Sequence, residues 1–193
     1  NTLSKDGTVA LTGSSISEDG RLLAYSTSSA GSDWQTWKVR DLTTGQDLPD
    51  TIEWVKFSNA VWTADGKGFF YARYDAPKEG EALKGANYYQ KLYYHRLGTP
   101  QSDDVLVYDR PDNKELGFGG QVTDDGRWMV ITTSEGTDDR YRISLIDLKD
   151  PAIKPRVLIP ALEKEGFRVL PVMRVGQEPP PAVGLNQERL CRY

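Results

Sequence analysis

A turn-and-strand unit that occurs three times restricts the possible folds of this chain more than any other feature. Each copy contains an Asp-Gly pair and runs directly into a hydrophobic strand. The copies occupy residues 17–25, 63–71 and 123–131. Asp accepts local backbone hydrogen bonds and Gly takes the positive φ of a tight turn, so each copy predicts a hairpin turn followed by a buried strand.

The spacing of these copies is typical of propeller blades. The Asp residues of successive copies are 46 and 60 residues apart, and a four-stranded blade takes about 40–50 residues. A further strand that ends in an acidic turn follows each copy, at 37–42, 105–109 and 143–148. Trp37 and Val39 share one face of the first of these strands, as expected for a half-buried strand.

We therefore expect an all-β fold, namely part of a β-propeller with about three blades of four antiparallel strands. The predicted fragment covers residues 1–162, with approximate blades at 13–58, 59–116 and 117–162. A β-sandwich or an open sheet with several Asp-Gly hairpins is the other architecture that this pattern allows. Of the tryptophans, four are expected to pack in the core or between blades: Trp34, Trp37, Trp54 and Trp62.

The two ends of the sequence differ from this pattern. The chain starts at Asn1 without an initiator Met or a signal region, so we expect an incomplete N-terminus. Residues 163–193 carry no repeat and include three consecutive prolines at 179–181, which cannot donate to a sheet ladder. This irregular tail is expected to be either a short strand with disordered sequence or sequence foreign to the fold.

The net charge of −4 excludes few functions, but it disfavours two kinds of partner. An acidic chain attracts neither phosphate backbones nor anionic lipid, so we expect no nucleic-acid and no membrane partner. No apolar run approaches the roughly 20 residues that span a bilayer. The single Cys191 forms no internal disulfide. We expect a soluble protein, cytoplasmic rather than exported, although no residue fixes the compartment.

No complete catalytic site can be assembled from these residues. The sequence lacks a Gly-x-Ser-x-Gly elbow, and residues 13–17 miss its second glycine. His95 is the only histidine, and a packed or surface role is favoured for it over that of a catalytic base. No metal site and no cofactor are predicted. Three pairs of carboxylates are expected to be solvated loop tips: Asp103-Asp104, Asp124-Asp125 and Asp138-Asp139.

Several longer stretches carry a resemblance to a known family. They lie at residues 1–11, 29–34, 55–58, 62–68 and 90–104, and the most distinctive is Gln-Lys-Leu-Tyr-Tyr-His-Arg-Leu-Gly-Thr from Gln90 to Thr99. Over residues 1 to about 160, the chain resembles the N-terminal propeller domain of the prolyl oligopeptidases. These serine-type endopeptidases hydrolyse short peptides after proline.

The resemblance implies a role beside an active site rather than within it. In that family a seven-bladed propeller covers an α/β-hydrolase domain that carries the whole catalytic triad, and it gates the access of short proline-containing peptides. The chain is then expected to lack the triad and to be inactive alone.

Two substrate-binding residues are implied by the resemblance. Phe57 would line an apolar subsite, where burial of the ring against a peptide contributes about 1.5–3 kcal/mol. Asp33 would lie near a substrate-binding arginine of the hydrolase domain. From the residues alone, Phe57 could equally be strand core and Asp33 a plain loop acid.

A stand-alone propeller-type module that binds a partner without catalysis is the alternative function. Three blades cannot close a ring, because known propellers have four or more. The blade count therefore favours a peptidase fragment over such a module.

Overall fold

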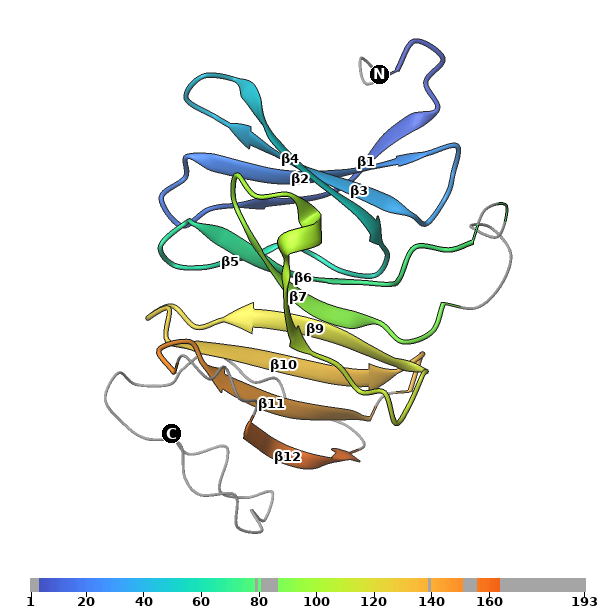
Figure 1. The fold of residues 1–193 in the computed structure, drawn as a ribbon, viewed down its shortest axis with the longest axis vertical. Coiled ribbons are helices and arrows are strands. Elements are labelled where there is room, and N and C mark those ends of the chain that lie inside the picture. Colours follow the sequence, from blue (N-terminus) through green and yellow to red (C-terminus); the bar gives the residue numbers. More distant parts are fainter. Residues whose placement is uncertain (1–3, 79, 81–86, 139, 151–155, 164–193) are drawn as a thin grey trace.

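The computed structural model describes residues 4–78, 80, 87–138, 140–150 and 156–163. In this part of the chain, twelve strands form three four-stranded antiparallel sheets, and the only helix is the short 3₁₀ helix η1 (Gln101–Asp103). The expected all-β fold is confirmed. Figure 1 shows the three sheets stacked in chain order, with β2 and β3 in the uppermost sheet and β10 and β11 in the lowest.

Each sheet consists of four strands that are consecutive in sequence. The first contains β1 (Val9–Ile16), β2 (Leu22–Ser29), β3 (Gln35–Asp41) and β4 (Gln46–Val55). The second contains β5 (Val61–Trp62), β6 (Gly68–Arg73), β7 (Lys91–Arg96) and β8 (Val105–Tyr108). The third contains β9 (Leu116–Val122), β10 (Trp128–Glu135), β11 (Tyr141–Asp147) and β12 (Arg156–Glu163).

The repeated turns join the first two strands of every sheet through one set of hydrogen bonds. In the first copy, the Ser17 hydroxyl donates to the Asp19 carboxylate at 2.6 Å and accepts the Leu22 backbone N–H at 2.9 Å. Gly20 supplies the positive φ of 72°. Equivalent hydroxyl–carboxylate pairs join Thr63 to Asp65 and Thr123 to Asp125. The sequence repeat is therefore a structural repeat.

The middle sheet is buried on both faces, as expected for a blade between two neighbours. Phe69 and Tyr71 of β6 pack into a core shared with the first sheet. Phe70 and Ala72, which point to the opposite face of the same strand, pack into a core shared with the third sheet. Side chains of alternating direction on one strand thus hold three sheets together.

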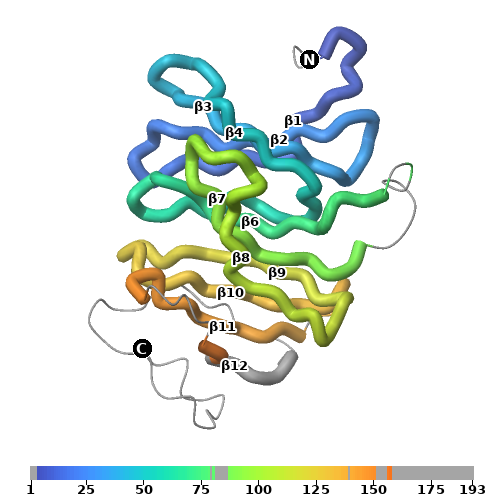
Figure 2. The backbone as a smooth tube through the Cα atoms, viewed as in Figure 1, coloured from blue at the N-terminus to red at the C-terminus, as the bar shows by residue number. Residues whose placement is uncertain are grey.

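Loops of two kinds lie at opposite ends of the strands. The Asp-Gly turns lie at one end, which we call the turn end. The β2–β3 loop, the β4–β5 crossover, the β6–β7 loop and the β10–β11 loop lie at the other, which we call the loop end, because antiparallel strands alternate in direction. In Figure 2 the loop end is on the right.

Two further predictions concern side-chain packing and the tail. Trp37 and Trp62 are buried in the core, whereas Trp34 and Trp54 are half-buried near the loop end. The expected tail begins at Glu163, the last residue of β12, and its other residues lie outside the described part of the chain.

Candidate functional site

Backbone strain is concentrated at the loop end. Among the described residues, the non-glycine residues with positive φ are Ala30, Trp54, Phe57 and Tyr89. All of them belong to the β2–β3 loop, the end of β4 and the crossover after it, or the β6–β7 loop. L-residues adopt this conformation at a cost of about 1–3 kcal/mol, and such strain clusters at functional sites. The turn end, by contrast, uses glycines where φ is positive.

Phe57 is an exposed aromatic residue rather than strand core. It lies in the crossover between β4 and β5 with a φ of 54°, and 72% of its surface is accessible. The backbone on either side is fastened to the second sheet: the Ala72 N–H donates to the Ser58 hydroxyl at 2.8 Å, and the Tyr74 N–H donates to the Trp54 carbonyl at 3.1 Å. The fold therefore holds a large apolar ring in solvent at a fixed place.

Gln90 connects this crossover to the third sheet. Its side chain is almost completely buried, with 2% of the residue exposed. The amide N–H donates to the Lys56 carbonyl at 3.0 Å, and the amide oxygen accepts the Phe118 backbone N–H at 2.6 Å. One side chain thus satisfies a backbone group in the crossover, next to Phe57, and another in β9.

Asp33 lies on the loop that packs against the same crossover. Its neighbour Trp34 contacts Trp54 edge-to-face, with ring centroids 5.6 Å apart. The ammonium group of the buried Lys56 lies 4.1 Å from the centre of the Trp34 ring, a cation–π contact. Asp33 and Phe57 are each adjacent in sequence to one partner of this contact, so the structure brings both predicted residues to one region. Asp33 itself is exposed.

A polar hollow of about 540 Å³ opens at the same end, between loops of the second and third sheets. It is lined by Asn87, Tyr88, Glu115, Glu135, Gly136, Thr137 and Asp138. The Lys114 ammonium lies 4.2 Å from the centre of the Tyr88 ring and offsets part of the negative charge. Sequence reasoning missed this hollow, because residues from three distant segments form it.

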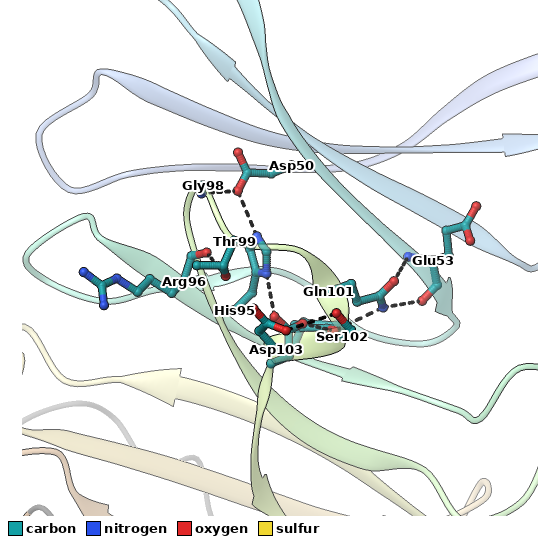
Figure 3. A network of polar contacts seen from close by, with 11 residues as sticks. Asp50, Glu53, His95, Arg96, Gly98, Thr99, Gln101, Ser102 and Asp103 are labelled. Carbon is teal, nitrogen blue, oxygen red and sulfur yellow. Dashed lines mark hydrogen bonds and ion pairs between the residues drawn. The ribbon is translucent and has the colours of Figure 1, made fainter.

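His95 belongs to a separate polar network, shown in Figure 3. Its Nδ1 is 2.7 Å from Asp104 Oδ1 and its Nε2 is 3.0 Å from Asp50 Oδ1, and all three side chains are fully buried. Burial by itself lowers the pKa of His95, but the hydrogen bonds to Asp104 and Asp50 outweigh it and raise this pKa above its ordinary value. Both ring nitrogens are occupied, and His95 is packed inside the protein rather than exposed at its surface.

The prediction that Asp103-Asp104 is a solvated loop tip is wrong for Asp104. Helix η1 folds back across the first and second sheets, which buries the Asp104 carboxylate against His95 and the Tyr71 hydroxyl. Asp103 stays exposed. The network links positions 45 residues apart in the sequence (Asp50 and His95), and no local sequence pattern marks such a pairing.

The described residues contain no group of three or more His, Cys, Asp or Glu side chains placed to hold a metal ion. In the same part of the chain, no helix has the length and apolar character needed to cross a membrane. The loop end presents an exposed aromatic ring, an exposed acid and a polar hollow.

Three stacked four-stranded sheets with these turns define consecutive blades of a β-propeller. The sequence model for the N-terminal β-propeller domain of prolyl oligopeptidase matches residues 1–169. This chain belongs to the prolyl oligopeptidase family.

Relatives with known names support this membership. The chain is 39% identical over 150 residues to a prolyl endopeptidase of Elizabethkingia meningoseptica, covering 78% of this chain and 21% of the relative. It is 38% identical over 167 residues to prolyl oligopeptidase A of Amanita bisporigera, covering 77% and 22%. The chain thus spans about a fifth of the length of these relatives.

Solved structures give the same fold. Prolyl oligopeptidase B of Galerina marginata, bound to a 35-residue hydrolysis and macrocyclization substrate, has a TM-score of 0.76 at 27% identity, covering 82% of this chain and 24% of that one. One structure from a study of two prolyl endopeptidases and their inter-domain dynamics has a TM-score of 0.72 at 38% identity, covering 82% and 22%.

Proposed function

We propose that this chain is the part of a serine-type prolyl endopeptidase that gates the access of short peptides to a hydrolase active site and shapes its subsites. The substrates are short peptides that contain proline, and the catalytic triad belongs to an α/β-hydrolase domain that faces the loop end. The observation that carries the proposal is the exposed Phe57 ring on a strained, firmly anchored crossover.

Phe57 is suited to bind an apolar side chain of the peptide on the N-terminal side of proline. Covering the exposed ring with a ligand lowers the free energy of the complex, because apolar surface is removed from water. Anchoring by Gln90 and Ser58 means that little conformational entropy is lost on binding, since the backbone is already held in place.

Asp33 is suited to pair with an arginine of the hydrolase domain. Its carboxylate is exposed, and within the described ranges it forms no ion pair. The contact between Trp34 and Lys56 fixes the loop that carries Asp33 next to the Phe57 crossover. A guanidinium group arriving at the loop end would therefore meet an acid beside the apolar ring.

The division of labour between the domains can be tested with a reporter peptide that contains proline. We expect no cleavage by this chain alone, because His95 is its only histidine and both ring nitrogens are occupied. A full-length protein that carries these blades and a hydrolase domain should cleave the peptide. Turnover by the chain alone that a serine-reactive inhibitor blocks would contradict the proposal.

The subsite role of Phe57 is tested by Phe57→Ala in that full-length protein. For peptides with a large apolar residue before proline, kcat/KM should fall about 10- to 100-fold, since the ring contributes about 1.5–3 kcal/mol and 1.4 kcal/mol corresponds to a factor of ten. Peptides with glycine before proline should be affected much less.

Leu42→Ala is the matched control, because Leu42 is also an exposed apolar residue (44%) but lies near the turn end. It should leave both peptides unaffected. An equal loss in the two variants, or a loss that does not depend on the residue before proline, would show that Phe57 is not part of a subsite.

A further inference from the structure

The Asp50–His95–Asp104 cluster joins two blades. Asp50 belongs to β4 of the first sheet, and His95 to β7 of the second. Asp50 Oδ1 also accepts the Gly98 backbone N–H at 2.6 Å, in the turn after β7. These contacts tie β4, at the edge of the first sheet, to the neighbouring blade (Figure 3).

Gln101 strengthens the same connection. Its amide N–H donates to the Glu53 carbonyl at 3.0 Å, and its amide oxygen accepts the Glu53 N–H at 3.0 Å. The Gln101 side chain thus bonds to the backbone of β4 in the way that a residue of a neighbouring strand would. Of these two sets of bonds, only the one at His95 contains a group that titrates near neutral pH.

Counting donors and acceptors restricts where the protons of the ring and the two carboxyls can lie. An ionised carboxylate only accepts hydrogen bonds, so two contacts from ring nitrogens to carboxylates need an N–H on each nitrogen. Asp104 accepts a second bond from the Tyr71 hydroxyl, and burial together with this bond raises the pKa of Tyr71, so that the phenol keeps its proton and donates. A neutral imidazole has one N–H and leaves one contact without a proton, unless a carboxyl supplies it.

The surroundings favour the positive charge. The groups that face the ring are the carboxyls of Asp50 and Asp104, the Tyr71 hydroxyl through Asp104, and the Phe69 ring at 5.3 Å. Among the described residues, neither carboxylate pairs with a lysine or an arginine, and Asp50 Oδ2 is buried without a hydrogen-bond partner. Two buried carboxylates need a nearby cation, and the imidazole is placed to be that cation.

We propose that His95 is held as a doubly protonated imidazolium that clasps β4 to the second blade, so that this junction loosens when the ring loses one proton. Because the pKa of His95 is raised in the folded chain, the stabilisation is complete below the unfolded value of about 6.5 and is lost as pH rises through the raised value. The junction between β4 and the second blade is therefore less stable at alkaline pH.

The protonation state can be read directly by NMR on the whole chain. His95 is the only histidine, so the ring-nitrogen signals of ¹⁵N-labelled histidine all come from this one imidazole. In a pH titration, we expect the ring to lose its second proton above about pH 6.5, the ordinary pKa of histidine, because the pKa of His95 is raised in the folded chain. A change to the ¹⁵N shifts of a neutral tautomer at or below about pH 6.5 would overturn the proposal.

Variants of Asp50 and Asp104 test whether these two carboxylates keep the His95 ring protonated. Asp50→Asn and Asp104→Asn keep the side-chain shape and should each lower the pKa of His95 by about one unit or more, the usual effect of an opposite charge at this distance. Asp103→Asn is the control, because Asp103 is exposed and does not touch the ring. An equal shift in the control would contradict the assignment.

Urea unfolding at pH 6 and pH 9 tests whether the protonated His95 ring stabilises the junction. Wild type should lose stability between these values, and His95→Gln should lose the pH-dependent part of this change. The same loss of stability between these pH values in wild type and in His95→Gln would overturn the proposal. If His95→Gln fails to fold, the comparison of Asp50→Asn with Asp103→Asn decides the question in the same way.

Discussion

At the scale of single residues, Phe57 combines an accessible aromatic ring with a left-handed backbone. Either feature alone would be unremarkable in a loop. At Phe57 the exposed ring and the strained backbone occur together. If Phe57 serves the proposed subsite, a substitution that relieves the strain should stabilise the fold and impair peptide binding.

We therefore compare Phe57→Gly with Phe57→Ala. Glycine adopts positive φ without a steric cost, whereas alanine carries the same strain as phenylalanine. Phe57→Gly should be about 1 kcal/mol more stable than Phe57→Ala in urea unfolding. If alanine proved as stable as glycine or more so, the backbone at this position would not be strained.

At the scale of secondary-structure elements, the crossover from β4 to β5 depends on Gln90. Its amide satisfies a carbonyl in the crossover and an N–H in β9, both in a buried setting. Gln101 makes the same pair of bonds to Glu53 at a more exposed position. Gln90 and Gln101 therefore allow the same kind of side-chain to backbone hydrogen bonds to be compared at two degrees of burial.

Gln90→Leu should destabilise the chain by about 2–6 kcal/mol, because two buried backbone groups lose their partners at about 1–3 kcal/mol each. Gln101→Leu should cost about 1 kcal/mol or less, since water can replace the lost bonds. Chemical unfolding of both variants provides the measurement. Equal effects would mean that Gln90 does not anchor the crossover.

These elements also show what the sequence could reveal. The Asp-Gly turns were predictable, because hydroxyl, carboxylate and glycine lie within a few residues and determine the turn locally. The position of Phe57 outside a strand was not predictable from the residues alone, since Val55, Lys56 and Phe57 read equally well as strand core. Its exposure depends on Gln90 and β9, which are distant in sequence.

The polar network illustrates the same limit more strongly. Asp104 looked like one half of a solvated acidic pair, yet η1 folds back and buries it against His95 and Tyr71. Only tertiary packing, which no local pattern encodes, brings Asp50 to the same ring. The family resemblance implied Phe57 and Asp33 as substrate-binding residues. The structure adds that the cation–π contact between Lys56 and Trp34 joins the two loops that carry them.

At the scale of the whole molecule, the three blades have two distinct ends. Hydroxyl–carboxylate pairs and glycine turns close the turn end, and strained loops with exposed side chains form the loop end. The proposed function assigns the peptide and the hydrolase domain to the loop end. It also requires that the peptide reach Phe57 in the assembled enzyme.

Photo-cross-linking tests this requirement most directly. In the full-length protein, p-benzoylphenylalanine would replace Phe57 at the loop end or, as a control, Leu42 near the turn end, and a labelled peptide containing proline would be added. The account predicts a cross-link from position 57 that unlabelled peptide competes away, and none from position 42. No competed cross-link at position 57, or equal labelling at both positions, would contradict it.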